Sequence, residues 1–160
     1  MKRLVLATLL ALSPLAVAAQ TDIALGGLNA DPSLPVEVTA DSLNVDQTSG
    51  TAVFEGNVVI GQGALRISAG RVEVVYSDAT GDIARLRASG GVTFVTETEA
   101  AEAQEADYDI ADGTLALSGD VLLTQGASAL SSDSMIVDLA TGTARMEGRV
   151  RTVFQQQGGN

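Results

Sequence analysis

Residues 51–62 of the chain read TAVFEGNVVIGQ, and residues 114–125 read TLALSGDVLLTQ. They belong to one ungapped match that lays residues 40–76 on residues 103–139, a constant shift of 63 positions (103 − 40). The match keeps the glycines, the Gln-Gly-Ala step that follows each stretch, and the apolar positions. It indicates an internal structural repeat, because isolated coincidences between β-rich segments would not share one register.

Apolar and polar residues alternate with a period of two through most of the chain, which is typical of β-strands. A Gly-x-Val phrase interrupts this alternation at Gly56, Gly90, Gly119 and Gly148. Strands and turns that recur at similar spacing predict an all-β fold of stacked strands. Residues 97–105 are rich in Glu and Ala, but their flanks alternate, so we predict a solvated loop or a charged strand edge there.

The alternation also assigns the two faces of each strand. In residues 51–62, Ala52, Phe54, Val58 and Ile60 point one way, and Glu55 and its alternate neighbours point the other. The inward set is aliphatic, since the chain is 3% aromatic and has no Trp. Such a set forms either a long aliphatic cavity or a tight sheet-on-sheet core, and the sequence leaves both open.

The first residues have the organisation of a secretory signal peptide. Basic Lys2 and Arg3 precede a short apolar run, and small residues follow it. We expect residues 1–19 to be removed on export, leaving no lipoprotein anchor because the chain has no Cys. The remaining boundaries are a flexible lead-in, one folded domain and a disordered tail, predicted at residues 20–35, 36–154 and 155–160.

Composition excludes most catalytic chemistry. Without residues 1–19, seven Arg face twenty Asp and Glu, a formal charge of 7 − 20 = −13 that opposes binding to nucleic acid. No His, Cys or Lys remains, which rules out Ser-His triads, Cys nucleophiles, His or Cys metal sites and Schiff bases. Carboxylate pairs such as Asp107 and Asp109 are expected by chance among twenty acidic residues. We predict that the protein is not an enzyme and uses no metal or cofactor.

Three stretches connect the chain to a known family. Residues 40–45 read ADSLNV, residues 54–63 read FEGNVVIGQG, and residues 67–72 read ISAGRV. Their A-D-x-L start, F-x-G-N-V turn, Q-G step and A-x-x-V return resemble the pattern of the OstA-like family. The turn and the step recur in the second copy of the repeat, and the resemblance covers residues 36–154.

The resemblance implies a twisted, open β-jelly roll of antiparallel strands that carries lipopolysaccharide through the periplasm. Its interior would shield the acyl chains, and its end strands would pair with inner-membrane and outer-membrane lipopolysaccharide-transport proteins and, head to tail, with further copies. The expected lipid-binding residues are Phe54, Val58, Ile60, Ile67, Val74, Tyr76, Phe94, Leu117, Leu123, Val137 and Met146. The expected partner edges contain Val36, Val38, Val45, Val150 and Phe154.

Two alternatives stay open at this point. A secreted structural or adhesive β-solenoid with a dry core has the same alternation, and a related OstA-like accessory domain could hold another lipid or act as a scaffold. The arginines allow two interpretations as well: phosphate contacts for a lipid headgroup, or charges that block wrong strand pairing. They cluster at Arg66 and Arg71, at Arg85 and Arg87, and at Arg145, Arg149 and Arg151.

Overall fold

The structure, a computed structural model, describes residues 21–24, 33–46 and 48–153. Within these ranges it contains strands and no helix, so no described helix could cross a membrane and the all-β prediction is confirmed. The strands are β1 (Thr21–Ala24), β2 (Glu37–Thr39), β3 (Ser42–Asp46), β4 (Thr51–Gln62), β5 (Leu65–Tyr76), β6 (Ile83–Val95), β7 (Glu99–Asp109), β8 (Thr114–Gln125), β9 (Ser128–Asp138), β10 (Thr143–Glu147) and β11 (Arg151–Val153).

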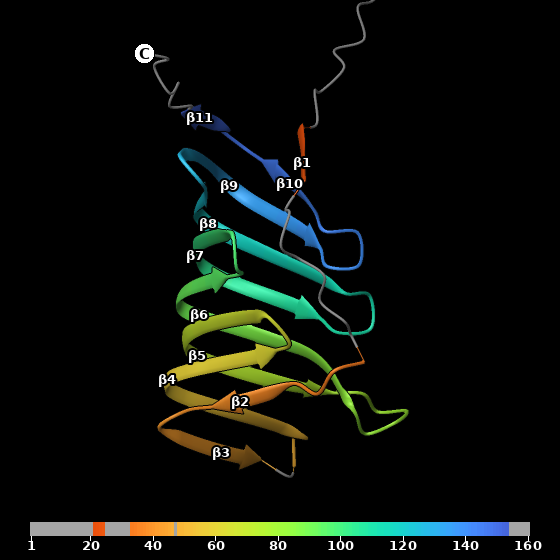
Figure 1. Ribbon diagram of the computed structural model, residues 1–160. Coiled ribbons are helices and arrows are strands. Elements are labelled where there is room, and N and C mark those ends of the chain that lie inside the picture. The colour runs from red at the N-terminus through yellow and green to blue at the C-terminus, as the bar shows by residue number, and fades with distance from the viewer. Residues whose placement is uncertain (1–20, 25–32, 47, 154–160) are drawn as a thin grey trace, which may run out of the picture.

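All described strands belong to one sheet, in which neighbouring strands run antiparallel. The strand order is β1-β10-β9-β8-β7-β6-β5-β4-β2, with β3 also paired to β4 and β11 to β9. Figure 1 shows the resulting stack, from β3 at the bottom to β1 and β11 at the top. From β4 to β10 each strand pairs with the next in the chain, whereas β1 pairs with a strand near the opposite end of the sequence.

Three of the turns share one sequence, Asp-x-x-x-Gly-Thr, which begins at Asp46, Asp109 and Asp138. In each turn the aspartate Oδ1 accepts a backbone N–H from two or three residues further on, at 2.8–3.1 Å. The glycine of each turn has a φ between 63° and 67°, a conformation that glycine adopts without steric cost. The turns therefore form from local sequence alone.

The Gly-x-Val phrases bend the strands at sharp corners. Both residues of a phrase have positive φ, with 78° and 46° at Gly56-Asn57 and 80° and 50° at Gly119-Asp120. The ladder shifts register at each corner, as a β-bulge does, so the strand changes direction without leaving the sheet. A side chain would not fit at Gly119, because an added Cβ would lie 2.7 Å from Cγ of Gln104.

The aligned corners fold the sheet into two layers. Layer A contains β1, β3 and β10 with residues 51–55, 71–76, 83–89, 105–109, 114–118 and 134–138 of β4 to β9. Layer B contains β2 and β11 with residues 58–62, 65–68, 92–95, 99–102, 121–125 and 128–132 of the same strands. Inward side chains of both layers form one hydrophobic core. Each buried Leu, Ile or Val contributes about 1.5–3 kcal/mol.

The prediction of a solvated loop or charged strand edge at residues 97–105 is wrong from Glu99 onward, and only residues 97 and 98 lie in an exposed bend. β7 is a central strand between β6 and β8, and Ala101 on it is fully buried. Small Ala side chains face the core along β7, and because Ala has low strand propensity the pattern resembles a charged helix or loop in sequence.

The predicted lead-in at residues 20–35 contains a strand. β1 pairs with β10 over four residues, from Thr21 opposite Met146 to Ala24 opposite Thr143. Its sequence carries no signal of this pairing, because four residues are too few to show a period and the partner lies at the far end of the chain. The predicted signal peptide at 1–19, Phe154 and the predicted tail at 155–160 lie outside the described residues.

Candidate functional site

The interior between the two layers contains almost all of the residues predicted to face a lipid. Nine of them are at most 3% exposed: Val58, Ile60, Ile67, Val74, Phe94, Leu117, Leu123, Val137 and Met146. Phe54 is partly buried and packs against the same core. The inward assignment from sequence alternation therefore holds across both layers, and these side chains pack tightly against one another.

Tyr76 is the exception to the predicted inward face. Its side chain is 41% exposed at the end of β5. The ladder between β5 and β6 shifts register between Val75 and Tyr76, and Tyr76 pairs with Ile83. Its exposure sets Tyr76 apart from the buried residues of the interior.

A polar bridge crosses the interior near the strand ends. The hydroxyl of Tyr108, in layer A, donates to Oε1 of Gln62, in layer B, at 2.5 Å. Nε2 of Gln62 donates in turn to the carbonyl oxygen of Leu34 at 3.0 Å. Tyr108 is 2% exposed and Gln62 is 1% exposed, and burial raises the pKa of the Tyr108 phenol. The bridge joins the two layers by side chains alone.

A buried carboxylate lies in layer B at the same margin. Glu99 is 4% exposed, and its Oε2 accepts hydrogen bonds from the hydroxyls of Thr96 and Thr98 at 2.6 and 2.5 Å. Its Oε1 accepts from Nε2 of Gln125 at 3.2 Å. Both side-chain oxygens of Glu99 thereby have hydrogen-bond partners, as buried polar atoms require.

Gln62, Glu99 and Gln125 are absent from the residues predicted from sequence. A signal for two of them was present, since Gln62 and Gln125 occupy the same repeat position and share the inward parity of Ile60 and Leu123. A glutamine on an inward position of a strand predicts a buried hydrogen bond. Glu99 carried no comparable signal, because it stands in a segment that lacks clear alternation.

The arginines of layer A lie on the outer face and pair with carboxylates on neighbouring strands. Arg85 bonds to Asp109 at 2.7 Å, Arg87 approaches Glu73 at 3.4 Å, and Arg71 pairs with Glu55. Asp107, one member of the carboxylate pair seen in the sequence, lies 3.3 Å from Arg85 and 3.6 Å from Arg87. At the last corner Arg149 pairs with Asp133. These contacts favour the structural interpretation of the charges.

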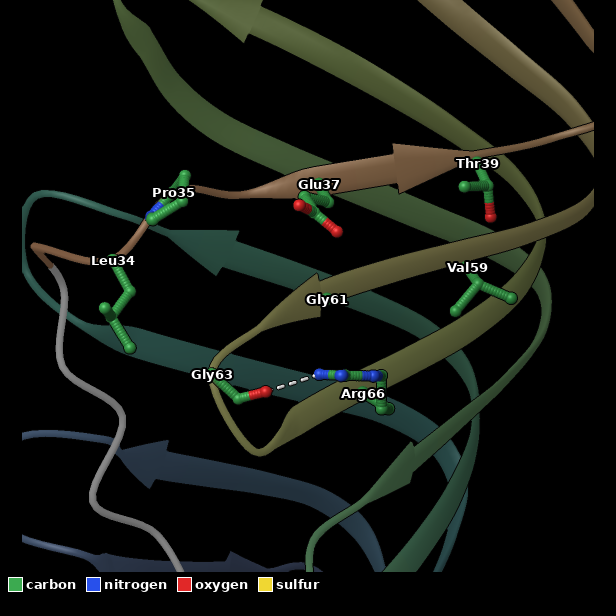
Figure 2. Close-up of a pocket in the computed structure, with 8 residues that line it drawn as sticks. All are labelled: Leu34, Pro35, Glu37, Thr39, Val59, Gly61, Gly63 and Arg66. Atoms are coloured by element: carbon green, nitrogen blue, oxygen red, sulfur yellow. Dashed lines mark hydrogen bonds between the residues drawn. The ribbon is translucent and has the colours of Figure 1, made fainter.

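A shallow cavity of about 420 Å³ lies outside layer B, beside β2, and Figure 2 shows its lining. Arg66 crosses it and donates to the carbonyl oxygens of Gly63 and Leu65 at 2.6 and 2.7 Å. Val59 and Arg66 point away from the core, so this cavity is separate from the interior. No cluster of acidic residues suited to a metal ion occurs in the described ranges.

The two ends of the stack differ in what covers them. At the β3 end, Leu43 and Val45 are on the inward side, opposite Phe54 and Ala52, yet they are 52% and 63% exposed. At the β10 end, the inward Ala144 and Met146 are buried. Of the other predicted edge residues, Val150 is 45% exposed, and Val36 and Val38 pack against the core from β2 and its approach.

The two-layered roll can now be compared with known proteins. Residues 37–143 match the family described as "LptA/(LptD N-terminal domain) LPS transport protein". The chain belongs to this family. Membership confirms the resemblance drawn from the motifs of the first repeat copy. It also confirms that the protein belongs among transport proteins and not among enzymes.

Two curated relatives and one solved structure resemble this member of the LptA/LptD N-terminal family. The uncharacterized protein R00383 of Rhizobium meliloti (strain 1021) is 27% identical over 153 residues, covering 89% of this chain and 82% of the relative. The lipopolysaccharide export system protein LptH of Pseudomonas aeruginosa is 32% identical over 73 residues, covering 46% of this chain and 41% of LptH.

The solved structure is the crystal structure of LptH, described as the LptA homologous periplasmic component of the lipopolysaccharide transport device of Pseudomonas aeruginosa. It matches with a TM-score of 0.69 and 17% identity, over 79% of this chain and 99% of that chain. At this identity the likeness establishes the fold, and it confirms the predicted β-jelly roll.

Proposed function

We propose that the protein is a periplasmic carrier of lipopolysaccharide whose interior shields acyl chains between layers A and B. The observation that carries the proposal is the continuous apolar core of a member of an LPS transport family. The predicted signal peptide and the likeness to LptH, a periplasmic component, support the periplasmic location.

The physical case for a shielded route rests on the cost of exposing an acyl chain to water. Each methylene contributes about 0.8 kcal/mol, so a twelve-carbon chain costs on the order of 10 kcal/mol in water. The inward residues are aliphatic with few rings, and a lining of this kind offers no shaped pocket that would hold a sliding chain in one place. Entry of a chain requires the packed layers to separate, and the Tyr108–Gln62 hydrogen bond opposes that separation.

The proposal includes a bridging role. Strands at the ends of an open sheet have unpaired backbone groups that bind further strands unless they are blocked. β2 and β3 form one end, and β1, which pairs with β10, and β11 form the other. Pairing of opposite ends would join copies head to tail, or join this protein to related domains of inner-membrane and outer-membrane proteins, through edges that contain Val38, Val45 and Val150.

Site-specific photo-crosslinking tests the carrier. A photo-reactive amino acid at Ile67 or Leu117, both buried, should capture lipopolysaccharide in cells. The outward neighbours Ser68 and Ser118 are exposed and serve as matched controls that should not capture it. Equal labelling of inward and outward positions would contradict an interior route.

The competing function, a structural β-solenoid with a dry core, is favoured by one observation. Leu115, Leu123, Met135 and Val137 are 0% exposed, so the core is closed in the described chain. The two functions differ in lipid content. A carrier should co-purify with lipopolysaccharide or take up a fluorescent acyl probe, and a dry solenoid should do neither.

A further inference from the structure

The strand β1 covers the outer edge of β10, the last strand of layer A. Its pairing is antiparallel, with Ile23 opposite Ala144 and Thr21 opposite Met146. Ile23 is partly buried and packs against the core. β11, the last strand of layer B, pairs with β9 alone among the described strands, and all three of its residues are exposed. The two layers thus end differently at this end of the roll.

The internal repeat shows which strand of the first copy is equivalent to β10. Ala144 pairs with Val137 of β9, and Leu86 of β6 pairs with Val74 of β5. Val74 and Val137 are equivalent under the shift of 63 positions (137 − 74 = 63). β10 therefore occupies the position in the second copy that the layer A part of β6 occupies in the first.

The neighbour of β6 then shows which strand suits the edge of β10. β6 pairs with β7 so that Leu86 is opposite Tyr108. The repeat equivalent of Tyr108 is Val45 of β3 (108 − 63 = 45). β3 of a second copy, placed on β10, would therefore set its Val45 opposite Ala144. β3 and β1 both fit this edge in the antiparallel direction, because strand directions alternate from β4 to β10.

We propose that β1 is a cap, supplied by the same chain, on the edge where β3 of a second copy binds. This inference rests on the proposed bridging role and adds its control step. Ile23 fills the position that Val45 of the incoming copy would fill, and Thr21 fills the position of Leu43. Layer B can make the first contact through β11, and layer A becomes continuous only when β1 leaves β10. At these two positions the incoming β3 brings the exposed apolar residues Leu43 and Val45, whereas β1 holds one apolar residue, Ile23, and one polar residue, Thr21.

The cap lowers the apparent affinity of self-association, because only the chains in which β1 has left β10 can bind β3 of a second copy. The apparent affinity of a binding-competent state falls in proportion to its population, so a cap closed nine-tenths of the time weakens association about 10-fold. Removing the cap restores that factor without a change in the contacting surfaces of β3 or β10.

The natural absence of Cys allows a disulfide test on the chain without its signal peptide. Paired residues of antiparallel strands lie at Cα separations that a disulfide accepts. Ile23→Cys with Ala144→Cys should lock the cap, and Ile23→Cys with Thr143→Cys, whose side chains point to opposite faces, is the control that should not bond. The oxidised locked protein should stay monomeric in analytical ultracentrifugation at concentrations where its reduced form assembles.

A second pair reports on the incoming strand. Val45→Cys with Ala144→Cys should form disulfides only between chains, because the two positions lie at opposite ends of the roll. Adding Ile23→Asp should open the cap. If the cap is closed nine-tenths of the time in the parent, the yield of these dimers should rise about 10-fold. Asn44→Cys with Ala144→Cys is the control for register. A locked protein that assembles normally, or an Ile23→Asp protein that stays monomeric, would overturn the proposal.

The outcomes separate the cap from the carrier. Loss of lipopolysaccharide crosslinking at Ile67 and Leu117 with an intact disulfide pattern would reject the carrier and leave the cap standing. If lipid crosslinking were normal and the substitutions at Ile23 left assembly unchanged, the cap alone would be rejected. Circular dichroism and thermal unfolding of Ile23→Asp and Ile23→Val should be alike, which shows that an effect on assembly does not come from unfolding.

Discussion

The two copies of the repeat fold alike but differ in burial. Residues 40–76, the first copy, lie at one end of the stack, and residues 103–139, the second copy, lie further inside it. Leu43 and Val45 of the first copy are 52% and 63% exposed, while their equivalents Ala106 and Tyr108 are 5% and 2% exposed. The same pattern thus gives the same strand and corner, and the neighbouring strand decides whether a side chain is buried.

The difference has a simple cause. In the second copy, β6 lies beside the strand that contains Ala106 and Tyr108, and in the first copy no described strand lies beyond β3. The first copy therefore presents an unfinished layer with apolar residues on its inner side. On the proposed bridging role, this end would receive the equivalent of β6 from another copy, and in this chain that equivalent is β10.

The largest effect is expected from a charge placed at equivalent inward positions of the two copies. Leu117→Asp puts an unpaired carboxylate into a site that is 1% exposed, and it should lower the free energy of unfolding by about 4 kcal/mol or more. Phe54→Asp, at the partly buried equivalent, should cost about 1–3 kcal/mol and also impair transport. Urea unfolding measures both, with Leu117→Met as the mild control. Equal losses would show that the end of the roll is as closed as its middle.

The corner glycines give the next largest effect and should behave alike in both copies. Gly119→Ala forces a φ near +80° on a side chain and brings Cβ against Gln104, so we expect a loss of about 2–3 kcal/mol in the free energy of unfolding. Gly56→Ala meets Asp41 in the same way. The control is Gly113→Ala, at a φ of 63° with open space around its Cβ, which should lose about 1–2 kcal/mol. If Gly119→Ala or Gly56→Ala lost no more unfolding free energy than Gly113→Ala, steric crowding of the added Cβ would not contribute to the loss.

Much of this architecture follows from local sequence. The repeat, the inward parity and the corner glycines predict the strands, the bends and ten of the eleven inward residues, Phe54 among them, because each depends on neighbours within one hairpin. The rest depends on distant contacts. The pairing of β1 with β10 and the bridge from Tyr108 to Gln62 join residues far apart in the chain. Tyr76 is exposed at the end of β5, where the ladder shifts register in a way that no single strand encodes.

A smaller effect should distinguish Tyr108 from its equivalent, Val45. Tyr108→Phe removes the donor to Gln62 and leaves a buried amide oxygen without it, which should cost about 1–2 kcal/mol in thermal or urea unfolding. Adding Gln62→Leu should recover part of that loss, since both polar groups are then gone. Val45→Ala, at an exposed site, should stay within about 0.5 kcal/mol of the parent. A Tyr108→Phe protein as stable as the parent would mean that water replaces the lost donor.

The smallest effect concerns two equivalent aspartates, Asp46 and Asp109, which begin the same turn in the two copies. The pKa of Asp109 is lowered first by the hydrogen bond from Arg85, whereas the pKa of Asp46 is lowered by the backbone N–H groups of Thr48 and Ser49. A carboxyl whose pKa is lower in the folded state stabilises the fold above its unfolded pKa of about 3.9, and the contribution is lost as pH falls through the folded value. Arg85→Met should therefore raise the pKa of Asp109 toward its ordinary value and leave that of Asp46 unchanged, as followed by NMR titration of the side-chain carboxyls. If both pKa values rose together, the variant would have loosened the roll as a whole, and if neither moved, the backbone N–H groups would account for the lowered pKa in both copies.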